Sequence, residues 1–144
     1  MALEQDPDAH PDDALPAGVE DAAGPLSEQA VRDTRLTPAE AVAGMHIRVP
    51  ARGNRKLRVL LEKAEADKQL KAWWHVANVN AVVRLEINDH SWVHVQIVTN
   101  IALKLLRQLV KHGVTPSLVS DYRMTTDDSE VLVVLAAMIA VGRL

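Results

Sequence analysis

Two histidines, His90 and His94, carry the side chains best suited to metal chemistry in this 144-residue sequence, and they flank Ser91-Trp92-Val93. His94 falls on the predicted buried stripe of a helix, one turn before Val98. It fits a core histidine with one satisfied nitrogen, or a metal ligand that points into a helical bundle, because neutral imidazole is the commonest protein metal ligand. One imidazole cannot hold a metal, since several donors must converge. His90 precedes the helix, either facing the same cavity or in a solvated loop.

The other candidate groups have simpler interpretations. His46, His75 and His112 have no carboxylate or histidine at ligand spacing, so we predict surface positions for them. The sequence contains no phosphate-binding loop, dinucleotide-binding glycine turn or nucleophile elbow. A basic cluster favours a solvated helix start over a phosphate site: Arg52, Arg55, Lys56 and Arg58.

Two consecutive helices, or one helix with a break near Asp67, are predicted ahead of the histidines. Apolar residues recur at helical spacing on both sides of that break, and the stripe changes phase across it. The first set is Leu57, Leu60, Leu61 and Ala64, and the second is Leu70, Trp73, Trp74 and Ala77. The second helix is expected to end around Leu85.

A third helix, residues 93–111, should position His94. Its predicted buried face contains His94, Val98, Ile101, Leu105 and Leu109, with Ala102 beside them. Gly113 comes next as a helix C-terminal cap, and Pro116 stands where a helix is not expected to continue.

A fourth helix is predicted to begin at Thr125-Thr126, where a threonine can cap it, with acidic residues in the first turn where the helix dipole favours them. Residues 131–139 are apolar on every side, which requires protein all around the helix. The valines make a strand the alternative, but the cap and the Ala-Ala-Met segment favour a helix. The fold class is therefore all-α.

The first fifty residues differ from the rest. They hold six of the seven prolines, and the first 31 residues carry eight acidic side chains and no Lys or Arg. Such a segment cannot bury enough apolar surface to offset its ordering entropy, so we predict a disordered acidic tail over residues 1–50 and a helical domain over 51–144. The exception is Thr37-Pro38-Ala39-Glu40, where Thr37 can cap a short helix.

The composition excludes several classes of protein. Without cysteine there is neither a disulfide framework nor a thiolate metal site. The acidic start lacks the features of a signal peptide, and no apolar run reaches the ~18 residues of a membrane span. The net charge of −3 includes only a mild basic excess after the tail, unlike a nucleic-acid binder. We therefore expect a cytoplasmic protein with no membrane or nucleic-acid partner.

Residues 78–85 and 88–98, the latter reading Asn-Asp-His-Ser-Trp-Val-His-Val-Gln-Ile-Val, resemble the HD superfamily of metal-dependent phosphohydrolases. The resemblance extends from about Leu57 to the C-terminus. It implies an all-helical bundle in which a first His, a His-Asp doublet and a later Asp gather divalent metal (Mn, Fe or Mg). The metal activates water to attack a phosphate ester or nucleotide. His94 matches the first histidine, and His90 is a possible pocket residue.

The sequence departs from that pattern where the doublet is expected. Val141-Gly142-Arg143 fits the residues that come after the doublet, but Ala140 stands in its place, and the later Asp has no position before Leu144. The expectation is thus an incomplete HD-type domain, truncated before the doublet, inactive alone and unable to hold the metal by itself. The alternatives are a non-catalytic interaction module that docks a partner, or self-associates, through the apolar helix 131–139, and a degenerate domain that binds nucleotide without hydrolysing it.

Overall fold

The computed structural model describes residues 35–85 and 90–141, and within these ranges it contains helices and no strand, which confirms the all-α fold. The elements are α2 (Pro38–Gly44), α3 (Arg55–Ala66), α4 (Lys68–Val79), the π-helix η2 (Asn80–Arg84), α5 (Trp92–Lys111), α6 (Ser117–Ser120) and α7 (Thr126–Val141). None of the described helices is long and apolar enough to cross a membrane.

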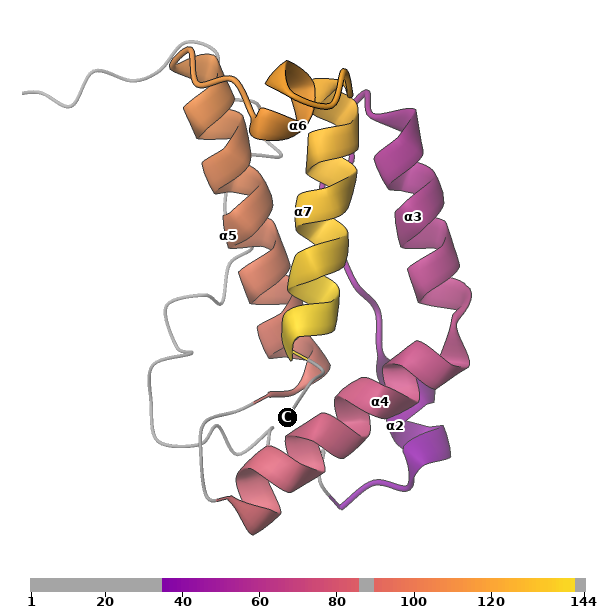
Figure 1. Ribbon diagram of the computed structural model, residues 1–144. Coiled ribbons are helices and arrows are strands. Elements are labelled where there is room, and N and C mark those ends of the chain that lie inside the picture. The colour runs from indigo at the N-terminus through magenta and orange to yellow at the C-terminus, as the bar shows by residue number, and fades with distance from the viewer. Residues whose placement is uncertain (1–34, 86–89, 142–144) are drawn as a thin grey trace, which may run out of the picture.

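Helices α5, α7 and α3 lie side by side, with α7 between the other two (Figure 1). Helix α4 crosses one end of this layer, and α2 packs against α4. Because α5 and α7 run in opposite directions, the first turn of α5 and the last turn of α7 lie at the same end of the bundle, next to α4 (Figure 1).

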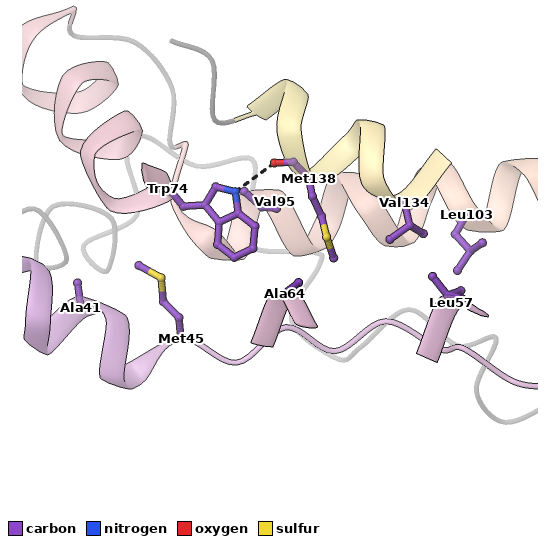
Figure 2. Close-up of a cluster of buried hydrophobic side chains, with 9 residues drawn as sticks. All are labelled: Ala41, Met45, Leu57, Ala64, Trp74, Val95, Leu103, Val134 and Met138. Atoms are coloured by element: carbon purple, nitrogen blue, oxygen red, sulfur yellow. Dashed lines mark hydrogen bonds between the residues drawn. The ribbon is translucent and has the colours of Figure 1, made fainter. Parts of the chain in front are cut away.

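The core is drawn from every one of these helices (Figure 2). Its members are aliphatic and methionine side chains around one indole, as expected for a sequence with three tryptophans and no phenylalanine. They are Ala41, Met45, Leu57, Ala64, Trp74, Val95, Leu103, Val134 and Met138.

The predicted break near Asp67 is confirmed. Asp67 ends α3 and also begins α4, where its side-chain Oδ1 accepts hydrogen bonds from the backbone nitrogens of Gln69 and Leu70 at 2.9 and 3.0 Å. One residue with extended backbone therefore separates the two helices and satisfies the amides that open the second. The second helix continues beyond α4 as the π-helix η2, which ends at Arg84 with Leu85 as its C-cap, so the predicted end around Leu85 is confirmed.

Helix α5 matches the predicted bounds within one residue, and Gly113 comes after it with a φ of 84°, a conformation that favours glycine. The predicted buried face is correct only in its first part: His94 and Val98 are partly buried, and Val98 packs against the core. The later predicted positions Ile101, Leu105 and Leu109 are 49%, 58% and 43% exposed, and the most buried positions form a different stripe, Val95, Thr99 and Leu103. The polar Thr99 in the middle made that stripe look less apolar in the sequence.

Helix α7 confirms the helical interpretation of the apolar segment. Thr125 caps its start: the hydroxyl accepts from the backbone nitrogen of Asp128 at 3.2 Å, and the Asp128 carboxylate accepts from the Thr125 backbone nitrogen at 2.9 Å. Val134 and Met138 are buried, but Leu132 and Ile139 are 38% and 47% exposed. The described helices therefore cover only part of this helix.

The folded unit begins earlier than residue 51, so the predicted boundary is wrong for the last part of the 1–50 segment. Thr37 and Glu40 form the capping box of α2, as the exception in the tail anticipated. Ala41 and Met45 enter the core, and the buried Lys71 Nζ donates to the Met45 carbonyl oxygen at 2.7 Å. Sequence composition averaged over fifty residues concealed these few apolar anchors. The rest of the predicted tail, residues 1–34, lies outside the described residues.

Candidate functional site

The structure brings His90 and His94 together at the start of α5. Their ring centroids are 5.4 Å apart with planes tilted by 36°, and both residues are partly buried. Ser91 is the N-cap residue of α5, so His90 comes just before the cap and His94 lies in the first turn of the helix. His90 therefore lies outside the helix, partly exposed, with its ring beside that of His94.

A hydrogen bond from α4 fixes the segment that carries His90. The backbone nitrogen of His90 donates to Asn78 Oδ1 at 3.1 Å, and Asn78 is 1% exposed. Asn78 is the first residue of the HD-like segment 78–85, but the sequence pattern indicates no role for it. Its contact with a residue twelve positions away depends on how α4 and α5 cross, so no local pattern could have revealed it.

The position expected for the His-Asp doublet, Ala140, lies at the same end of the bundle as His94. Val95 follows His94 in the sequence, and Met138 is two residues before Ala140. Val95 and Met138 are neighbours in the core (Figure 2). Alanine supplies no donor atom. Within residues 35–85 and 90–141 no group of three or more His, Asp or Glu side chains is arranged to hold a metal ion.

His75, predicted to be at the surface, is 5% exposed and lies on the inner side of α4. The prediction rested on the lack of a carboxylate or histidine at ligand spacing, and that lack does not determine whether a side chain is buried. His75 lines a cavity together with Asn78 and Ser91.

His46 and His112 are exposed, as predicted. His46 nevertheless has a carboxylate partner: its Nδ1 lies 2.8 Å from Glu65 Oε1, and the same oxygen accepts from Lys71 Nζ at 3.0 Å. Burial acts to raise the pKa of the Glu65 carboxyl, but hydrogen bonds from Lys71, His46 and the Ile47 backbone outweigh it and lower that pKa. This cluster fastens the segment after α2 to α3 and α4.

The basic cluster at the start of α3 also makes structural contacts. Lys56 Nζ lies 2.7 Å from Asp128 Oδ1 in the first turn of α7, and hydrogen bonds from Lys56 and Thr125 hold the pKa of Asp128 far below its usual range. Arg58 donates to the carbonyl oxygen of Arg52 at 3.2 Å. These contacts agree with the predicted helix start rather than a phosphate site.

A buried polar network that the sequence did not reveal joins three helices. Arg107 of α5 donates to both carboxylate oxygens of Glu130 in α7, at 2.8 and 3.1 Å. Asn54, which caps α3, donates to Glu130 Oε2 at 2.9 Å. The partners are 23 and 76 positions apart in sequence, so only the tertiary fold pairs them.

Part of the chain is similar in sequence to a known protein. An uncharacterized protein of Methanocaldococcus jannaschii is 35% identical over 80 residues, which cover 56% of this chain and 31% of that protein. The chain thus spans less than a third of the length of this relative. No family model matches the chain, and no solved structure matches it.

Proposed function

We propose that this chain supplies the N-terminal helices of an HD-type metal-dependent phosphohydrolase, an enzyme of the cytoplasm that acts on phosphate esters or nucleotides. In this proposal His94 is the first metal-binding histidine and His90 is its neighbour in the pocket. The observation that carries the proposal is the His90–His94 pair, whose rings lie 5.4 Å apart at the start of a bundle helix.

The arrangement of the helices supports the same proposal. The position at which the HD pattern requires the His-Asp doublet is reached by the last turn of α7, which lies at the same end of the bundle as His94 (Figure 1). A metal there would polarise a phosphoryl oxygen and lower the pKa of a bound water. The M. jannaschii relative is much longer than the matched segment, and in this proposal the remaining ligands come from residues outside such a segment.

The described residues do not by themselves fit a bound metal. Divalent metals of this class take about four to six donors, and two imidazoles leave most of these positions to other groups. His90 and His94 therefore contribute ligands or orient them, and the described part of the chain carries no catalytic step alone.

Metal binding tests the proposal directly. Titration of the chain with Mn²⁺, followed by the loss of its free-ion EPR signal, should show weak binding. His94→Ala should abolish it, and His90→Ala should weaken it. His112→Ala is the matched control, because His112 is exposed at the far end of α5 and should leave binding unchanged. Equal binding by all four proteins would refute a role for the pair.

Turnover provides a second measurement. The chain alone should not hydrolyse bis(p-nitrophenyl) phosphate in the presence of Mn²⁺, because too few donors are present. Turnover that disappears with His94→Ala would show that the site is more complete than we propose and would require a search for substitute ligands.

A non-catalytic interaction module is the second candidate, and the exposed apolar residues of α5 and α7 favour it. Ile101, Leu105 and Leu109 form one exposed stripe at helical spacing, and Leu132 and Ile139 belong to another. Burial of an apolar side chain contributes ~1.5–3 kcal/mol, so such stripes gain stability from a partner or a second copy of the chain. Metal binding separates this candidate from the first, because a docking module does not require His94.

A further inference from the structure

The second half of α5 has an outer face that is both apolar and basic. Its apolar residues are the exposed Ile101, Leu105 and Leu109. Lys104 is exposed as well, three positions after Ile101 and seven before the exposed Lys111, and such spacings place residues on one side of a helix. Helix α5 stands at the edge of the layer of helices, next to α7 (Figure 1). These five residues, the outer face of α5, therefore point away from the core.

The charge of α5 has one sign. The sequence from Trp92 to Lys111 contains Lys104, Arg107 and Lys111 and neither Asp nor Glu. Arg107 donates to Glu130 of α7, which places its charge on the inner side of the helix. The outer face therefore suits a partner that combines apolar side chains with acidic ones, because complementary charges select the partner and fix its register.

The N-terminal segment of the same chain has this chemistry. All 16 Lys and Arg residues come after residue 31, whereas eight acidic residues come before it. Residues 12–28 combine large apolar side chains with acids at both ends and in the middle. The apolar residues are Leu15, Val19 and Leu26, and the acids are Asp12, Asp13, Glu20, Asp21 and Glu28.

The position at which this segment joins the described part of the chain brings it within reach of α5. Leu36 lines the same cavity as Ser91 and Trp92, at the start of α5. Ile101 is nine positions beyond Trp92, or about 14 Å along a helix that rises 1.5 Å per residue. An extended chain covers ~3.3 Å per residue, so residues 29–35 alone can span that distance.

The covalent connection favours this segment over a separate molecule. A binding segment on a short linker experiences an effective concentration in the millimolar range. A contact with a dissociation constant of about 0.1 mM is therefore mostly formed within one chain, while a second copy at micromolar concentration leaves it mostly open. A segment of this composition binds weakly for its size, because it must be ordered on binding.

We propose that residues 12–28 dock on the outer face of α5 within the same chain. Their apolar side chains cover Ile101, Leu105 and Leu109, and their carboxylates lie beside Lys104 and Lys111. Any other partner of this face must displace the segment, which thereby controls access to it. The contact lies in the second half of α5 and requires neither His94 nor a metal.

Paramagnetic NMR on the full-length chain tests the proposal. The sequence has no cysteine, so Ala23→Cys creates a single site for a nitroxide label in the middle of the segment. In the ¹⁵N-labelled chain, the nitroxide should weaken the amide signals of residues 101–111, and reduction of the label should restore them. Residues 58–63 of α3, at the opposite edge of the layer, should keep their intensity.

Two sets of variants show what holds the segment in place. Lys104→Glu combined with Lys111→Glu should restore most of the lost intensity, as should Leu105→Ser, which removes an exposed apolar contact. Lys63→Glu combined with Lys68→Glu is the matched control, because both lysines are exposed where α3 ends and α4 begins. About 1 M NaCl, where the Debye length is ~3 Å, should also weaken the effect. Unchanged amide shifts outside residues 101–111 confirm that each variant is folded.

Four results would overturn the proposal. The first is a loss of intensity no greater at residues 101–111 than at residues 58–63. The second is a loss that persists in the Lys104→Glu, Lys111→Glu chain. The third is a loss that appears equally when the ¹⁵N-labelled chain is mixed with separate nitroxide-labelled chains, which would assign the face to a second copy. The fourth is binding to phosphatidylserine vesicles that the two lysine substitutions abolish, which would assign the face to an anionic membrane surface.

Discussion

The indole Nε1 of Trp74 donates a hydrogen bond of 3.1 Å to the carbonyl oxygen of Met138 (Figure 2). Met138 lies in the last turn of α7, where carbonyl groups lack a partner within the described helix. Trp74 comes from α4 and is 1% exposed. One side chain therefore fills the core and also satisfies the end of the most apolar helix, which ties the crossing helix to the bundle.

Trp74→Phe should lower the free energy of unfolding by about 1–3 kcal/mol, because it leaves the buried Met138 carbonyl without its donor while retaining most of the ring. Urea denaturation followed by circular dichroism measures the change. Trp73→Phe is the matched control: Trp73 is 58% exposed, and its replacement should alter stability by less than about 0.5 kcal/mol. Equal effects of the two substitutions would show that the hydrogen bond contributes nothing.

Met45→Ala should destabilise the protein by about 2–5 kcal/mol, since Met45 is 3% exposed and its removal leaves a hole beside Trp74. Thermal unfolding followed by circular dichroism measures the loss. Val42→Ala, at a half-buried position of α2 just before Met45, should cost less. A chain that tolerates Met45→Ala without loss would support the original boundary at residue 50, with α2 dispensable for the folded unit.

Glu130→Gln should destabilise the protein at neutral pH by about 1.5–3 kcal/mol, the range for hydrogen bonds to charged groups. The side chains of Arg107 and Glu130 are only 15% and 11% exposed, so the remaining Arg107 charge would be poorly solvated. Glu62→Gln, at an exposed position of α3, is the control and should change stability little.

The same pair predicts a pH dependence. Burial acts to raise the pKa of Glu130, but hydrogen bonds from Arg107 and Asn54 and the charges of Arg107 and Arg52 lower it below 4.5. The ionised pair therefore stabilises the fold fully above the unfolded-state pKa, and this stability is lost as the pH falls through the lowered pKa. Urea midpoints from pH 7 down to pH 3 should fall less steeply for Glu130→Gln than for the wild type. Parallel curves would contradict the assignment.

Simultaneous Leu132→Glu and Ile139→Glu should disperse any oligomer while retaining the helical fold, because both residues are substantially exposed. Analytical ultracentrifugation at several concentrations measures the association. Val134→Glu is the contrast, since Val134 is 0% exposed and a buried carboxylate should unfold the chain. A wild-type chain that stays monomeric at high concentration and binds no hydrophobic dye would show that this stripe is not a contact surface.

The helices themselves were largely determined by the sequence, because their signals are local. Asp67 caps one helix where another ends, Thr125 and Asp128 satisfy the first amides of α7, and Gly113 takes the positive φ after α5. Each of these effects acts within one turn of its residue, so the order and bounds of the helices depended on neighbouring residues alone. At the starts of α2, α3, α4 and α7, side chains hydrogen-bond backbone amides that the helix leaves unpaired.

Only the tertiary structure decided which faces those helices bury and which distant groups meet. Helix α5 carries two apolar stripes, and the position of α7 selected the one that contains Thr99. The crossing of α4 with α5 buried His75 and brought Asn78 to His90, and the packing of α7 joined Glu130 to Arg107. Such contacts link residues far apart in the chain, and burial is a property of the assembled helices. The sequence supplies side chains that are able to form such contacts, while the packing geometry of the helices decides which contacts form.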